Sequence, residues 1–114
     1  PLYLRTRSFV LSKSNPYYFS GIMGHGVGSP HTGINRIWPI AITVKALTAN
    51  NDYDVVASLK MLKSTHAGTG FMHESFMKDD PTQFTRKWFA WANTLFGELV
   101  LDTYRTRPGL LKEV

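Results

Sequence analysis

The chain has 114 residues, of which 43% are hydrophobic and 13% aromatic, and it carries a formal net charge of +5. This apolar content excludes intrinsic disorder, because disordered chains lack the apolar surface that offsets their conformational entropy. Lys and Arg residues are scattered from Arg5 to Lys112 without forming a basic run, which argues against a nucleic-acid partner.

Two absences narrow the class of protein further. No cysteine is present, which excludes disulfides and thiolate metal sites and leaves the compartment undetermined, with a slight preference for the cytoplasm. No apolar run approaches the roughly 20 residues that cross a bilayer, so no membrane partner is expected. The chain begins at Pro1, and residues 2–11 resemble a structured interior, so we expect a piece of a larger protein.

The first third of the chain is predicted to be mostly irregular. Residues 1–19 indicate a short strand or an extended arm, followed by a bend at Asn15-Pro16. Residues 20–36 are rich in glycine and contain a proline and two histidines, which predicts a structured loop rather than a regular element.

A first helix is predicted over residues 37–49. Pro39 lies near its first turn, where the missing N–H costs nothing, and three apolar residues follow at helical spacing. These three are Ile40, Val44 and Leu47. Residues 48–52 then form a tight connection to the next helix.

A second helix is predicted over residues 52–64, with Asp52 as its N-cap. Lys60 and Lys63 are expected to face water on the side opposite an apolar stripe. The residues of this stripe are Val55, Val56, Leu59 and Leu62.

The last third is predicted to be an irregular loop over residues 65–80, followed by a long helix. Asp80 is the expected N-cap, Pro81 the first helical residue and Thr103 the approximate end. The apolar residues at helical spacing are Phe84, Trp88, Trp91, Ala92, Leu95, Phe96 and Leu99. The tail after Pro108 is expected to be a frayed end.

This order of elements has a geometric consequence. If the tight connection sends the second helix back along the first, the loops 20–36 and 65–80 open on the same face. All four histidines, Glu74, Asp79 and Asp80 are then expected on that face.

The first loop carries polar groups suited to ligand binding. Ser29, His31 and Thr32 lie between Gly28 and Gly33, and glycines allow close approach of a backbone to a ligand. Alternatively, these side chains only cap the following helix, but several polar side chains on one loop favour a functional role.

The second loop carries the candidate catalytic residue. Glu74 stands among apolar neighbours between Gly70 and Phe76, the environment of a carboxylate poised to act as a general base. A buried, hydrogen-bonded structural Glu is the alternative. No second histidine follows His73-Glu74 at the HExxH spacing, so neither a metal nor a cofactor is expected.

Two aromatic residues of the predicted last helix have two interpretations. Trp88 and Trp91 are three residues apart and could form a sugar platform, but a core stripe is the commoner explanation and is favoured. Arg86, in the first turns of that helix, is expected to reach the active face.

Together these segments resemble the C-terminal quarter of the exo-α-1,6-mannosidases of glycoside hydrolase family 125. The resemblance covers residues 3 to about 102. The matching stretches are Arg7 with Asn15-Pro16-Tyr17-Tyr18, GVGSPHTG at 26–33, IWPIAI at 37–42, MHESF at 72–76 and DDPTQFTRKWFAWANTLFGEL at 79–99.

The resemblance implies an all-α fold, an (α/α)6 barrel of which residues 1–114 are the C-terminal part of a single catalytic domain, with about three helices and two long active-face loops. It implies inverting, exo-acting hydrolysis of α-1,6-linked mannose in glycans, with Glu74 as general base. Ser29, His31, His73 and Arg86 are then candidates for sugar binding.

The general acid of that family lies upstream of these motifs, so the isolated chain is expected to be inactive and poorly soluble. Another α-glycosidase on the same fold, or a non-catalytic sugar-binding or structural module, remains an alternative. The oligomeric state is left open.

Overall fold

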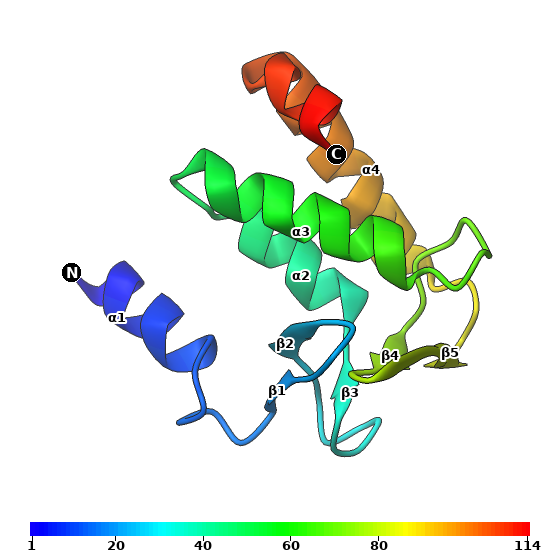
Figure 1. Ribbon diagram of the computed structural model, residues 1–114. Helices are drawn as coiled ribbons and strands as arrows, with labels where there is room; N and C mark the ends of the chain where they lie inside the picture. Colours follow the sequence, from blue (N-terminus) through cyan, green and yellow to red (C-terminus); the bar gives the residue numbers. More distant parts are fainter.

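The computed structural model describes residues 1–114 and contains four α-helices, five short strands and a C-terminal 3-10 helix (Figure 1). In chain order the elements are α1 (Leu2–Val10), β1 (Tyr18–Ser20), β2 (His25–Val27), β3 (Arg36–Ile37), α2 (Pro39–Leu47), α3 (Asp52–Thr65), β4 (Ser75–Met77), β5 (Asp80–Thr85), α4 (Ala90–Thr106) and η1 (Pro108–Glu113). None of the helices is long and apolar enough to cross a bilayer.

Helix α2 is the centre of the helical core, because both α3 and α4 pack against it. This confirms the predicted helices at 37–49 and 52–64 and the position of Pro39 in the first turn. The N-cap of α3 is Asn51, one residue before the predicted Asp52. The Asn51 side chain accepts a hydrogen bond from the N–H of Asp54 at 2.8 Å. The buried hydrophobic residues are Phe19, Ile37, Ile42, Ala46, Val55, Leu59, Leu62, Met72, Phe76, Ala92, Leu99 and Leu110.

Short strands lie within the two segments 20–36 and 65–80, which the sequence predicted to be irregular, and they pair these segments with each other. Strands β1 and β2 form an antiparallel hairpin, and β3, β4 and β5 form an antiparallel sheet in that order. Ile37 of β3 lies opposite Phe76 of β4, and both side chains are fully buried. This pairing brings the two loops to the same end of the helices, as the sequence predicted.

The predicted helix over 81–103 is wrong in its first part. Residues Asp80–Thr85 form strand β5, and α4 begins only at Ala90. Asp80 accepts hydrogen bonds from the Thr82 N–H at 3.0 Å and from its hydroxyl, so it shapes a turn and caps no helix. Phe84 fits the spacing of the helix, but its position opposite Phe76 in the sheet decides the local structure.

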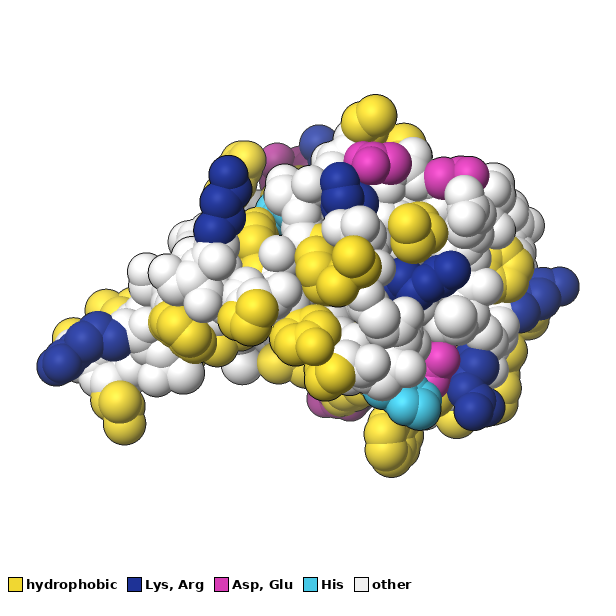
Figure 2. All heavy atoms as spheres, turned by 90° about the horizontal axis from the view of Figure 1, so that it is seen from below, with side chains coloured by type: hydrophobic (Ala, Val, Ile, Leu, Met, Phe, Trp, Pro, Cys, Tyr) yellow, Lys and Arg dark blue, Asp and Glu magenta, His cyan; other side chains and the backbone are white.

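Helix α1 replaces the strand or arm that the sequence predicted, and none of its residues is buried. It is attached through Arg7, which donates to Asp54 Oδ2 at 3.0 Å and to the Lys45 carbonyl at 3.1 Å. A largely apolar groove of about 530 Å³ separates it from α2. Figure 2 shows α1 projecting at the left with exposed hydrophobic side chains, so no residue of this chain covers that side of α1.

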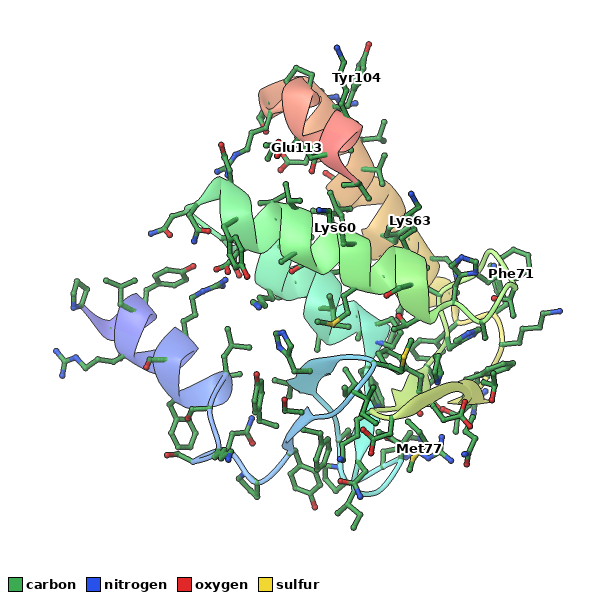
Figure 3. The ribbon with its side chains drawn as sticks, in the orientation of Figure 1. Lys60, Lys63, Phe71, Met77, Tyr104 and Glu113 are labelled. Atoms are coloured by element: carbon green, nitrogen blue, oxygen red, sulfur yellow. The ribbon has the colours of Figure 1, made fainter.

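The C-terminal tail is ordered, contrary to the predicted frayed end. Leu110 of η1 is buried, and Lys63 Nζ donates to the Val114 carbonyl at 2.9 Å. Figure 3 shows Lys60, Lys63 and Glu113 in the region between α3 and η1. The tail is held because η1 packs on both α3 and α4.

Gly26 and Gly28 of the first loop serve close packing within the protein. A Cβ on Gly28 would lie 2.1 Å from the Arg36 carbonyl oxygen, and one on Gly26 would lie 2.9 Å from Ile37. The approach that Gly28 permits is therefore to the start of β3, and not to a ligand as the sequence suggested.

Gly28→Ala is expected to lower the stability of the full-length protein by about 2 kcal/mol or more, because two backbone segments must separate to admit the methyl group. Gly97→Ala is the matched control. Gly97 lies in α4 with no neighbour near its Cβ position, so alanine should raise stability by about 0.5–1 kcal/mol. Equal midpoints of urea unfolding for both variants would contradict this.

Candidate active site

Glu74 lies in a run of five consecutive buried residues, Met72–Phe76, at the start of β4. Its backbone N–H points at the end of β5, where it reaches the Thr85 carbonyl at 3.1 Å and the Arg86 carbonyl at 3.3 Å. The sheet therefore holds the backbone of Glu74, and its side chain is only 8% exposed.

One oxygen of the Glu74 carboxylate takes both of its close contacts with basic side chains. Arg86 Nε lies 3.2 Å from Oε2, and His31 Nε2 lies 3.7 Å from the same atom. Both partners are about two-thirds exposed, at 65% and 68% of their side chains. Both ion-pair contacts thus fall on Oε2, and Oε1 takes part in none. A buried carboxylate with one free oxygen is able to accept a proton from a bound water.

The loop that carries His31 is held by its own polar groups. Ser29 Oγ accepts from the His31 N–H at 3.1 Å, and Trp38 Nε1 donates to Thr32 Oγ1 at 2.7 Å. The ring of His31 packs edge-on against Trp38, with 6.3 Å between ring centroids. Ser29 and Thr32 thus shape the loop, and His31 is the member of this group that reaches Glu74.

The contacts of His73 favour a structural role, and its predicted role in sugar binding stays a prediction. Its side chain is buried, with Nδ1 2.7 Å from the Lys87 carbonyl oxygen and Nε2 3.2 Å from the His66 carbonyl oxygen. Its ring stacks on Phe84 with 4.0 Å between centroids. Both nitrogens are engaged by the backbone, so none is left for a sugar hydroxyl.

The two aspartates after the second loop are also engaged in holding the backbone. Asp79 accepts from the Ile22 N–H at 2.7 Å, and this bond, with that from Lys78, lowers the pKa of Asp79. Hydrogen bonds from Thr82 and then Gln83 likewise lower the pKa of Asp80. A lowered pKa makes a carboxyl group a poor proton donor, so neither residue suits the role of general acid.

His25 does not join the site, contrary to the expectation that all four histidines share its face. It lies in the β1–β2 hairpin, where its Nδ1 is 3.2 Å from the Tyr18 hydroxyl. Burial, and secondly the charge of Lys45, lowers the pKa of His25. No three His, Asp or Glu side chains gather as a set that could hold a metal ion.

Trp88 and Trp91 are exposed at 57% and 70%, so the residues of this chain by themselves do not bury them in a core. A series of aromatic rings leads from the site toward Trp91. The ring centroids of Trp38 and Phe89 are 6.1 Å apart and those of Phe89 and Trp91 are 5.8 Å apart, and each pair packs edge to face. Sequence reasoning missed Trp38 and Phe89. Their only signal was the position of each aromatic residue directly before a helix.

Comparison with known proteins places the chain among glycosidases. Residues 1–101 match the model of a family described as metal-independent α-mannosidases, glycoside hydrolase family 125. The chain is 45% identical over 114 residues to the meiotically up-regulated gene 157 protein of Schizosaccharomyces pombe. This match covers 99% of this chain and 22% of that protein.

A solved structure is also similar. It is that of a Streptococcus pneumoniae metal-independent α-mannosidase in a non-productive complex with α-1,6-mannobiose, with a TM-score of 0.88 and 46% identity. The match covers 92% of this chain and 25% of that one. The chain thus spans about a quarter of the length of these relatives.

Proposed function

Because the chain belongs to glycoside hydrolase family 125, the metal-independent α-mannosidases, we propose that it is the C-terminal part of a single catalytic domain that releases non-reducing terminal α-1,6-linked mannose from glycans. The observation that carries the proposal is the Glu74 carboxylate, buried at the meeting point of two loops with its Oε1 free. The disaccharide in the Streptococcus pneumoniae relative supports α-1,6-linked mannose as the substrate.

The proposed reaction is a single displacement with inversion. Glu74 takes one proton from a water molecule while the water oxygen bonds to the anomeric carbon, and the bond from that carbon to the leaving oxygen breaks. A carboxylic acid on the opposite side of the sugar protonates the leaving oxygen, and β-mannose is the first product. Inverting enzymes place the two carboxyl groups roughly 6.5–9.5 Å apart, which leaves room for the water.

We propose that the acid comes from residues outside this chain, and the engagement of Asp79 and Asp80 in holding the backbone supports this. We also propose that the complete domain is an (α/α)6 barrel, in which helices from the remaining part cover the apolar surface left open here. That surface includes the groove beside α1 and the two exposed tryptophans, Trp88 and Trp91. Ser29 and His31 lie where they could also reach the sugar, on the loop that meets Glu74.

The full-length protein is expected to release mannose from α-1,6-mannobiose, with β-mannose appearing first by NMR. The isolated 114-residue chain is expected to be inactive and poorly soluble, because it lacks the acid and exposes apolar residues such as Leu2 and Trp91. Panels of α-1,2- and α-1,3-mannobiose and α-glucosides are the controls for linkage and sugar. Turnover of another α-glycoside alone would favour a different glycosidase, and binding without turnover would favour a sugar-binding module.

A further inference from the structure

We propose that Arg86 is a positioning residue, which holds Oε2 of Glu74 so that Oε1 is the oxygen that activates the water. This inference rests on the proposed function of Glu74. It replaces the expectation that Arg86 binds the sugar directly, and it assigns distinct tasks to the two carboxylate oxygens.

The backbone conformation of Arg86 is the first argument. Its φ is +44°, in the left-handed region that residues other than glycine rarely adopt. Such conformations are retained where the surrounding structure requires them, and they gather at functional sites. Arg86 directly follows β5, so this turn lies next to the strand that holds Glu74.

The turn allows one residue to hold both the backbone and the side chain of Glu74. The Arg86 carbonyl lies 3.3 Å from the Glu74 nitrogen, and its guanidinium Nε lies 3.2 Å from Oε2. The carbonyl groups on either side of Arg86 contact the same segment. The Thr85 carbonyl accepts from the Glu74 N–H, and the Lys87 carbonyl contacts the buried ring of His73. Residues 85–87 therefore hold 73–74 through three successive carbonyl groups.

The distribution of charge around the carboxylate is the second argument. Arg86 and His31 approach the same oxygen from two different loops, and no charged group approaches Oε1. An ion pair at one oxygen restricts the rotation of the carboxylate, so it favours one orientation of the other oxygen. Such restriction matters for catalysis, because a displacement of about 1 Å in a reacting group can lower a rate about 100-fold.

The test compares kcat and KM of full-length variants on α-1,6-mannobiose. Arg86→Ala should lower kcat about 100-fold and leave KM within about threefold, and Arg86→Lys should recover part of the loss. Arg86→Gly also removes the guanidinium but relieves the left-handed backbone, so it should fold well and lose kcat equally. Arg36→Ala is the matched control: Arg36 of β3 donates to the Gln83 carbonyl at 3.1 Å, away from Glu74, and its loss should leave kcat within about twofold.

Chemical rescue separates positioning from a general structural effect. Added guanidinium ion should restore part of kcat in Arg86→Ala and Arg86→Gly, whereas urea at the same concentration should not. A rise in KM of tenfold or more with kcat unchanged would make Arg86 a sugar ligand and overturn the inference. Unchanged kinetics in both variants would overturn it as well.

The positioning role of Arg86 can be wrong while the proposed function of Glu74 is right. If Glu74→Gln abolishes turnover while Arg86→Ala keeps the wild-type kcat, only the positioning role is wrong. If Glu74→Gln itself keeps the wild-type rate, the base assignment fails, whatever Arg86 does.

Discussion

Glu74→Gln is expected to lower kcat for mannose release from α-1,6-mannobiose by about 100- to 10,000-fold in the full-length protein. Removal of a general base commonly has an effect of this size. Glutamine keeps the volume of the side chain and an oxygen for Arg86 and His31, but its amide does not take a proton from water. The fold and substrate binding should therefore be retained while the chemical step is lost.

Two controls show whether that loss is chemical. Glu98→Gln changes an exposed residue of α4 in the same way and should leave kcat within about twofold. Azide, a nucleophile that needs no deprotonation, should restore turnover of a mannoside with a good leaving group in Glu74→Gln. Wild-type turnover in Glu74→Gln would show that the base lies elsewhere.

His73→Leu is expected to lower the free energy of unfolding of the full-length protein by about 2–3 kcal/mol. A buried polar group left without its partner costs about 1–3 kcal/mol, and loss of the stack on Phe84 adds about 0.5–1.5 kcal/mol before partial relaxation. Urea unfolding measures this directly. KM should stay within about threefold, because the ring reaches backbone carbonyls and not the sugar.

His31→Leu is the matched control for stability. His31 is exposed, so the same substitution there should change the free energy of unfolding by about 0.5 kcal/mol or less. A large rise in KM with unchanged stability in His73→Leu would restore the sugar-binding role that the sequence suggested for His73.

The features that the sequence predicted correctly depend on local patterns. Helices α2 and α3 have an apolar stripe at helical spacing and clear starting signals, and both lie where expected. The meeting of the loops that carry His31 and Glu74 followed from a short connection between two helices, whereas strands β2 and β4 lie within segments that were predicted to be irregular. The family assignment came from long motifs in a fixed order, and it is confirmed.

The mistakes occur where distant contacts override local preference. Helix α1 buries no residue. Its apolar residues therefore do not form the stripe at helical spacing by which a buried helix is recognised in a sequence. The segment Asp80–Thr85 has both a proline after an aspartate, typical of helix starts, and β-prone residues, and pairing with β4 selects the strand. Trp88, which was predicted to lie in the long helix, therefore precedes α4.

The sequence by itself determined two core helices and the family, because periodicity and motif order are written along the chain, and it pointed to Glu74 as the candidate base. Only the tertiary structure decided what surrounds Glu74: Arg86 and His31 at one oxygen, and His73 turned inward to the backbone. Those contacts join residues of two loops and a strand, and their geometry is set by the pairing of β3, β4 and β5, for which local sequence carries no direct signal.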